Sequence, residues 1–193
     1  LPENKNISFQ EKEKEINQLQ LVSIGRIAPE KNTLYALEVL KEVAHRVTFD
    51  IYGPIYSSDY WSKCETVIKQ LPANIRVNYK GILAHEKVAS TLQNYHAFFS
   101  PSTGENFGHS IIEAMSNSGI PIISDKTPWR NLEQKNVGFD IPLNAPLVFA
   151  EKIDQLAAMD YTTFNEMSSK THQFATAIIG DAELIKKYTT LFN

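Results

Sequence analysis

Short apolar runs alternate with amphipathic stretches along most of the chain. The runs are rich in β-branched residues and predict strands, over residues 21–26, 48–52, 76–79, 97–100, 121–124 and 137–141. The stretches between them predict helices, over residues 33–45, 59–70, 86–94 and 110–118, with three more helices from residue 146 onward. Regular alternation of strand and helix is typical of a parallel sheet with helices on both faces. The pattern therefore predicts an α/β fold, a Rossmann-like three-layer domain with a parallel sheet of about six strands.

The length and composition fit one globular domain. The chain has 193 residues, of which 42% are hydrophobic and 21% are charged. Residues 1–18 are polar and rich in Lys and Glu, and we expect a linker or accessory segment there, with the domain over residues 19–193. Because the chain begins at Leu1, we also expect it to be a piece of a longer protein.

Charge and hydropathy exclude several classes of function. A net charge of −3 gives no reason to expect nucleic acid as a partner, so any phosphate site must be a local cluster of cations. No apolar run approaches the roughly 20 residues that span a bilayer, and residues 1–18 do not resemble a signal segment. The single cysteine, Cys64, excludes an internal disulfide and fits a reducing compartment, so we expect a cytoplasmic protein.

The first candidate loop follows the first predicted strand. Gly25 allows the backbone to come close to a ligand, and Arg26 can bind a phosphate through two parallel hydrogen bonds. Lys31 adds a point charge five residues further on. Two cations aimed at a diphosphate would also stabilise the charge that grows on it as it leaves. An isolated pair of cations in a loop would be ordinary surface charge; the position of these two, at the carboxyl edge of the predicted sheet, favours a binding role.

The second candidate loop joins the predicted strand 97–100 to the helix that follows it. Glu105 and Glu113 enclose seven residues, among them Phe107 and Gly108, and a helix N-terminus there would offer free N–H groups to a phosphate. Carboxylates face hydroxyl groups rather than phosphate, so the combination indicates a nucleotide-sugar. For Glu113 there is a structural alternative, because Ser110 and Glu113 match a capping box with Ser110 as the N-cap. His109 is expected to form a wall of the site.

Other chemistry is excluded by missing motifs. The chain contains no Asp-x-Asp pair for a divalent ion on a diphosphate, and no Gly-x-x-x-x-Gly-Lys-Ser/Thr loop. The first strand does not lead into Gly-x-Gly-x-x-Gly, which argues against a dinucleotide oxidoreductase. The five histidines are scattered, with no pair at zinc spacing.

These motifs together resemble those of glycosyltransferase family 4, retaining enzymes with the two-domain GT-B fold. Gly25-Arg26 with Lys31 matches one family motif, and Glu105 with Glu113 and the intervening Phe107-Gly108 matches another. The likeness covers roughly residues 20–145, and it is to the C-terminal, donor-binding half of the fold. It implies a transferase that moves a sugar from a nucleoside-diphosphate carrier to a hydroxyl acceptor, in polysaccharide or glycoconjugate biosynthesis.

The resemblance also implies roles for individual residues. Arg26 and Lys31 would hold the diphosphate, Glu113 the ribose, and Glu105 the transferred sugar, while the nucleobase would lie near residues 53–54 and 81–83. The implied catalytic residues are Glu105, Arg26 and Lys31. The implied donor-binding residues are Gly25, Arg26, Lys31, Gly53, Leu83, Glu105, Asn106, Phe107, Gly108 and Glu113. No metal ion and no other cofactor is expected.

The resemblance further implies that the acceptor-binding N-terminal domain is absent from this chain. The isolated domain would then bind donor but transfer little, and any membrane association would come from the absent part. We also expect exposed apolar surface near the last helix, around residues 191–193. Two alternatives remain open: the donor half of another GT-B enzyme, such as a sugar-nucleotide epimerase or a glycogen-type synthase, and a flavodoxin-like binding module without chemistry.

Overall fold

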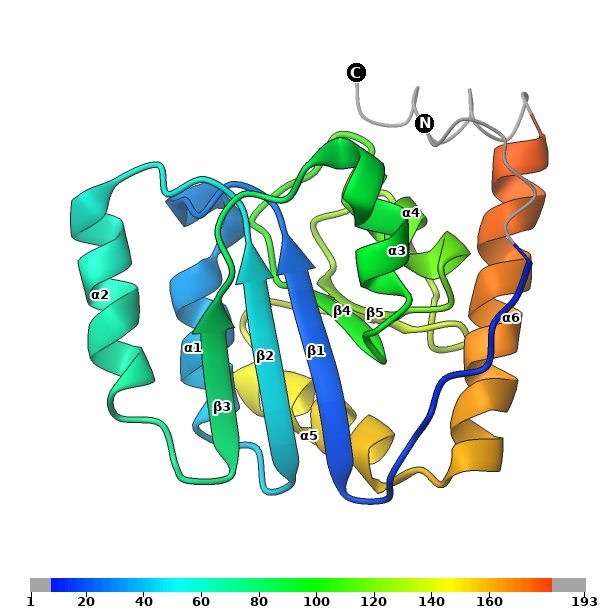
Figure 1. Cartoon of the computed structure of the whole chain (residues 1–193), viewed down its shortest axis with the longest axis horizontal. Helices are drawn as coiled ribbons and strands as arrows, with labels where there is room; N and C mark the ends of the chain where they lie inside the picture. Colours follow the sequence, from blue (N-terminus) through cyan, green and yellow to red (C-terminus); the bar gives the residue numbers. More distant parts are fainter. Residues whose placement is uncertain (1–7, 182–193) are drawn as a thin grey trace.

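A computed structural model describes residues 8–181 of the chain (Figure 1). The strands are β1 (Gln18–Ile24), β2 (Arg46–Tyr52), β3 (Ile75–Tyr79), β4 (Ala97–Ser100), β5 (Ile120–Ser124) and β6 (Phe139–Ile141). The α-helices are α1 (Thr33–Leu40), α2 (Ser58–Ile68), α3 (Val88–Leu92), α4 (His109–Ser116), α5 (Pro146–Ala158) and α6 (Tyr161–Gly180). Two 3₁₀ turns, η1 (Pro29–Lys31) and η2 (His85–Lys87), precede α1 and α3. None of the helices in this part of the chain is long and apolar enough to cross a membrane.

The strands form one parallel sheet in the order β3-β2-β1-β4-β5-β6. The chain steps outward from β1 to β3 and then returns to place β4 on the other side of β1. This reversal makes the space above β1 and β4 the topological switch point, where open α/β sheets bind ligands at the carboxyl ends of their strands. The predicted three-layer α/β fold with six parallel strands is confirmed.

Both faces of the sheet are buried, and the core accordingly falls into two clusters. Phe99 of β4 packs with Phe49 and Phe149 on the face covered by α1 and α5. Its neighbour Phe98 faces the opposite way, into a cluster with Ile111 of α4. Strands buried on both faces have near-continuous apolar sequences, which is why β4 and β5 are recognisable as strands.

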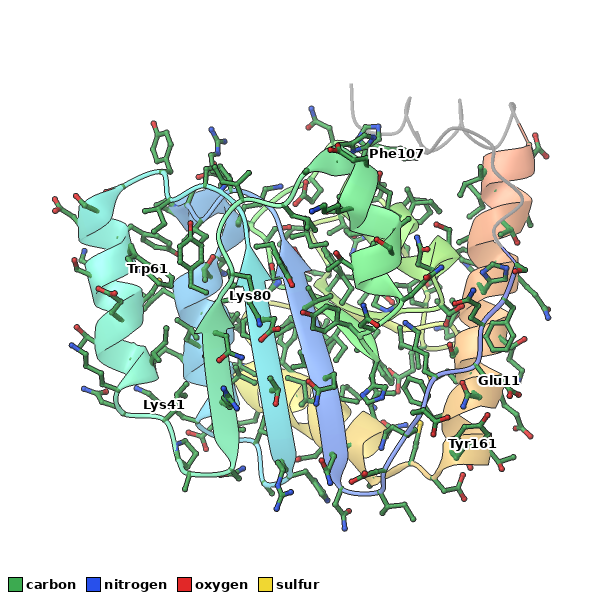
Figure 2. All side chains as sticks on the ribbon, in the orientation of Figure 1. Glu11, Lys41, Trp61, Lys80, Phe107 and Tyr161 are labelled. Atoms are coloured by element: carbon green, nitrogen blue, oxygen red, sulfur yellow. The ribbon has the colours of Figure 1, made fainter. Side chains whose placement is uncertain are left out.

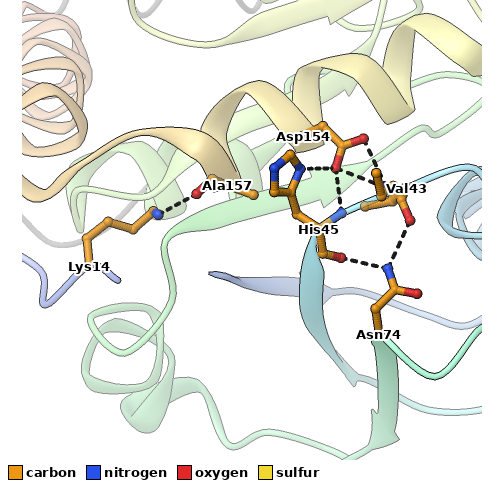
Figure 3. A network of polar contacts seen from close by, with 7 residues as sticks. Lys14, Val43, His45, Asn74, Asp154 and Ala157 are labelled. Atoms are coloured by element: carbon orange, nitrogen blue, oxygen red, sulfur yellow. Dashed lines mark hydrogen bonds and ion pairs between the residues drawn. The ribbon is translucent and has the colours of Figure 1, made fainter. Parts of the chain in front are cut away.

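Long-range contacts move some helix ends away from their predicted places. The helix expected over 33–45 ends at Leu40, and the N–H groups of Ala44 and His45 instead donate to the Asp154 carboxylate of α5, at 2.9–3.1 Å. Figure 3 shows this cluster, in which the His45 ring also lies 2.6 Å from Asp154. The chain after residue 146 forms α5 and α6; the third helix expected there, with its apolar end at 191–193, lies outside the described residues.

The segment from residue 8 to residue 17 contains no helix or strand but is firmly attached to the domain. It runs alongside α6 (Figure 1), where the Lys12 backbone and the Asn165 side chain exchange two hydrogen bonds. The buried Lys12 ammonium donates to the Leu92 and Tyr95 carbonyls at the end of α3, and burial lowers the Lys12 pKa to about 7. The Lys14 ammonium donates to the Ala157 carbonyl at the end of α5 (Figure 3). Both lysines satisfy carbonyls that a helix end leaves unpaired.

Candidate functional site

A cavity of about 790 Å³ opens at the carboxyl edge of the sheet, at the switch point between β1 and β4. Three loops and one helix end form its walls: the loops after β1, β3 and β4, and the first turn of α4. The lining residues are Ile24, Gly25, Lys31, His85, Gly104, Glu105, Asn106, Phe107, Gly108, His109, Ser110 and Glu113. The two loops chosen from the sequence therefore share one cavity.

An ion pair joins these two loops. The Lys31 ammonium lies 2.6 Å from a Glu105 carboxylate oxygen, and the side chains are 29% and 13% exposed. The backbones are joined as well, because the Thr103 N–H donates to the Glu30 carbonyl at 2.9 Å and the Asn32 side chain donates to the Pro101 carbonyl at 3.1 Å. A cation and a carboxylate are thus held together in a fixed frame.

The first turn of α4 has a free N-terminus. Its N-cap is Gly108, in the left-handed conformation with φ of 74°, and no side chain caps the helix within the described residues. The capping box, considered as the structural alternative for Glu113, is wrong, because Ser110 is the second residue of α4 rather than its N-cap. The helix begins earlier because the left-handed Gly108 already accepts from the Ile111 and Ile112 N–H groups. Glu113 is therefore not required as a cap, and it lines the cavity instead.

A buried tryptophan fixes the loop before α4. The Trp129 indole N–H donates to the Phe107 carbonyl at 2.8 Å, and the two rings pack edge to face. A Cβ on Gly108 would lie 2.8 Å from Ile111 and 3.1 Å from the Trp129 indole nitrogen, so the tryptophan also requires a glycine there. Figure 2 places Phe107 at the edge where the arrowheads of β1 and β2 point. Trp129 is 22 residues away along the chain, and no sequence motif connected it with this loop.

Gly53 supports the site without lining the cavity. It has φ of 142°, and a Cβ there would lie 1.9 Å from the Gly25 carbonyl oxygen. The Gly25 N–H donates to the Tyr52 carbonyl at 2.9 Å, so the loops after β1 and β2 are in direct backbone contact. The requirement for glycine at 53 is a packing requirement between these two loops.

Arg26 lies outside the cavity wall. Its guanidinium pairs with Glu30 at 2.5 Å and lies over the Tyr56 ring, 5.1 Å from the centroid, with half of the side chain exposed. Leu83 is likewise not among the lining residues, whereas its near neighbour His85 is. Sequence reasoning did not select His85, because a single histidine after a strand matches no motif. The roles expected for Arg26 and Leu83 stay predictions.

The carboxylates and imidazoles of the cavity do not form a metal centre. Within residues 8–181, no group of three or more His, Cys, Asp or Glu side chains is arranged to hold a metal ion. The positive charge that the structure brings to the cavity comes from Lys31 and from the N-terminus of α4.

Comparison with known proteins identifies the family. Residues 4–176 match the family model described as glycosyl transferases group 1. This chain belongs to the group 1 glycosyltransferases. The match extends through the segment at residues 8–17 and nearly to the end of α6. The resemblance to glycosyltransferases inferred from the two motifs is confirmed, and membership of a transferase family with it.

Curated relatives are N-acetylglucosaminyltransferases by name. The chain is 32% identical over 132 residues, 65% of its length, to the GtfA subunit of the UDP-N-acetylglucosamine–peptide N-acetylglucosaminyltransferase of Streptococcus agalactiae. It is 33% identical over 104 residues, 52% of its length, to the 2-deoxystreptamine N-acetyl-D-glucosaminyltransferase of Niallia circulans. These matches span 25% and 26% of the relatives, so the chain corresponds to about a quarter of their length.

Solved structures share the fold. TarM of S. aureus, in a complex that contains UDP, matches with a TM-score of 0.73 at 23% identity, over 96% of this chain and 38% of TarM. The C-terminal domain of a group 1 glycosyltransferase (LpcC) of Francisella tularensis matches with a TM-score of 0.70 at 20% identity, over 82% of this chain and 85% of that domain. The domain has the fold of one half of GT-B glycosyltransferases, and likeness to an isolated C-terminal domain is consistent with the C-terminal half.

Proposed function

We propose that this chain is the donor-binding domain of a retaining glycosyltransferase, and that its cavity binds a nucleoside-diphosphate sugar. The observation that carries the proposal is the Lys31–Glu105 pair beside the uncapped N-terminus of α4. A lysine and free N–H groups suit a diphosphate, while a carboxylate suits sugar hydroxyls. A site with both lies at the switch point of the sheet in a glycosyltransferase family member.

The proposed roles follow the position of each group in the cavity. Lys31 and the N–H groups at the start of α4 bind the diphosphate, with the backbone around Phe107 and Gly108 beside it. Glu105, next to Lys31, accepts hydrogen bonds from the transferred sugar, and Glu113 accepts from the ribose hydroxyls. Arg26 lies in the same loop as Lys31, and a role at the diphosphate requires its guanidinium to leave Glu30 for the ligand. Cations on the leaving group stabilise the charge that develops as the glycosidic bond breaks.

We further propose a UDP-linked N-acetylhexosamine as the donor. The support comes from the printed names of the curated relatives, which transfer N-acetylglucosamine, and from similar solved structures that contain UDP. Because the chain spans about a quarter of these relatives, the acceptor site is proposed to lie in another domain of the parent protein. The isolated chain should accordingly bind donor and transfer little.

Retention would follow if the acceptor approaches the anomeric carbon on the face from which the diphosphate departs. The same cavity would then hold the leaving group while the acceptor domain closes over it. The biological pathway that we propose is polysaccharide or glycoconjugate assembly, in which the second domain would bind the molecule that carries the acceptor hydroxyl.

The test is ligand binding by the 193-residue chain, followed by NMR or calorimetry. UDP, GDP, UDP-N-acetylglucosamine and uridine are titrated into wild type, Lys31→Ala and Lys63→Ala, the last being an exposed lysine on α2 far from the cavity. We expect a Kd of about 0.1–1 mM for UDP, as suits half of a two-domain cleft. Lys31→Ala should weaken UDP binding about tenfold or more, because it removes a charge-assisted contact, and leave uridine binding unchanged. If Lys31→Ala weakens uridine and UDP equally, or no nucleotide binds, the proposal is wrong.

A further inference from the structure

His109 is the one histidine of the α4 turn, and the family motifs give it no role. It lines the cavity as the first residue of α4. Its imidazole packs on the Phe107 ring, with centroids 4.8 Å apart and an angle of 53° between the planes. His109 is exposed, but because Trp129 holds Phe107 in turn, one face of the imidazole rests on a buried, fixed ring.

The position of His109 on the helix brings its side chain toward an anion at the helix N-terminus. Side chains of an α-helix tilt toward the N-terminal end, so an imidazole on the first residue extends past the free N–H groups. Lys31 lies across the same cavity on η1. A diphosphate held by Lys31 and the N–H groups would therefore be within reach of His109.

The charged groups around the imidazole come from every wall of the cavity. Lys31 on η1 and His85 on η2 oppose its protonation, while Glu105 in the loop and Glu113 on α4 favour it. Because Glu105 is already paired with Lys31, the effects of these two charges on the imidazole largely cancel. A bound diphosphate adds negative charge to the cavity, and this charge favours the imidazolium form of His109.

We propose that protonated His109 donates a hydrogen bond to the diphosphate of the donor and so makes donor binding at this site depend on pH. The proposal rests on the proposed function, because it assumes that the cavity binds a nucleoside-diphosphate sugar. Imidazole is the side chain that changes charge between pH 5 and 8. Donor binding should then be strongest when the imidazolium is present and should weaken as pH rises.

The donor itself must not titrate in the range of the measurement. The terminal phosphate of UDP loses a proton near pH 6, which would mask the effect. Each phosphate of UDP-N-acetylglucosamine carries one ester bond and the shared anhydride oxygen, so neither has a second ionisation near neutral pH and this ligand reports on the protein alone. His45 provides a matched control, because it lies at the opposite edge of the sheet beside Asp154.

The experiment measures the Kd of UDP-N-acetylglucosamine from about pH 6 to about pH 8 with wild type, His109→Gln, His85→Gln and His45→Gln. For wild type and His45→Gln we expect affinity to fall about two- to fivefold over this range, the size of one solvent-exposed charge interaction. His109→Gln should bind with nearly constant affinity, equal to that of wild type at high pH. A pH dependence that survives in His109→Gln, or that disappears in His85→Gln alone, contradicts the proposal.

NMR titration of the His109 imidazole gives a second readout that a purely structural role would not move. We expect the midpoint of its titration to shift to higher pH when UDP-N-acetylglucosamine is added, and not when uridine is added. Binding without that shift refutes the role of His109 and leaves the proposed function standing. Failure of every nucleotide to bind refutes the proposed function, and the inference with it.

Discussion

Replacing Glu105 with glutamine tests how the cavity changes from its free to its bound state. In the free protein the Lys31 ammonium is 2.6 Å from the Glu105 carboxylate. A diphosphate that binds Lys31 must share the ammonium with this carboxylate or displace it. Glu105→Gln keeps the shape of the side chain and removes the competing charge, so Lys31 becomes free for the ligand.

The size of the effect follows from how exposed the pair is. A fully exposed ion pair contributes roughly 0.2–1 kcal/mol, and a hydrogen bond between charged groups about 1.5–3 kcal/mol. With side chains 29% and 13% exposed, this pair lies between the two cases. We take about 1 kcal/mol, which corresponds to roughly fivefold tighter binding of UDP by Glu105→Gln. UDP-N-acetylglucosamine should gain less than UDP, because the same change removes an acceptor for the sugar hydroxyls.

Calorimetry with both ligands measures the two effects separately. Glu133→Gln is the control, because Glu133 also forms a 2.7 Å pair with a lysine, Lys152, away from the cavity. We expect the control to bind both ligands like wild type. The difference between wild type and Glu105→Gln should shrink at high ionic strength, because salt screens the pair. If Glu105→Gln binds UDP no more tightly than wild type at low salt, the diphosphate does not meet Lys31 and the reasoning fails.

Three further outcomes are expected. Gly53→Ala should lower the free energy of unfolding by about 3 kcal/mol or more in urea denaturation, because its Cβ would lie 1.9 Å from the Gly25 carbonyl oxygen. Gly104→Ala is the control and should be tolerated, because its Cβ would meet no atom within 4 Å. Burial lowers the Lys12 pKa from 10.5 to about 7, so between these two pH values the unfolded chain binds one proton more than the folded chain. The free energy of unfolding should therefore rise with pH from about 7 toward 10.5. Lys12→Met should flatten that slope in urea titrations at several pH values. UDP binding should survive EDTA, because Lys31 and the α4 N-terminus supply the positive charge; loss of binding that Mg²⁺ restores would contradict this.

The strands were predictable because their signal is local. A central strand such as β4 is buried on both faces and consists of consecutive apolar residues, whatever its neighbours are. Helix ends were less predictable because their partners are distant. The end of α1 depends on Asp154, more than a hundred residues away along the chain. No window of sequence around Leu40 contains that information.

The charged residues of the candidate site could be predicted where their spacing along the chain forms a recognisable motif. Lys31 and Glu105 were both selected from their loops, and the structure brings them into contact. The capping box failed because the left-handed Gly108 starts the helix before Ser110, and nothing in the local pattern distinguishes the two starts. Trp129 and His85 were missed for a different reason. His85 lines the cavity and Trp129 holds the Phe107 loop from behind, and each comes from a loop that carries no motif of its own.

The backbone around the cavity is held in place by packing, and the cations of the first loop are already paired within the protein. Gly53 against Gly25, and Trp129 against Phe107, fix the loops before any ligand arrives. The two cations of the first loop, in contrast, each already have a carboxylate partner, Glu105 for Lys31 and Glu30 for Arg26. Donor binding would then exchange ion pairs within the protein for ion pairs with phosphate, so little net electrostatic energy is gained in one domain alone. That exchange gives a physical reason for the weak, salt-sensitive binding expected of the isolated chain, and for a second domain that would exclude water from the same groups.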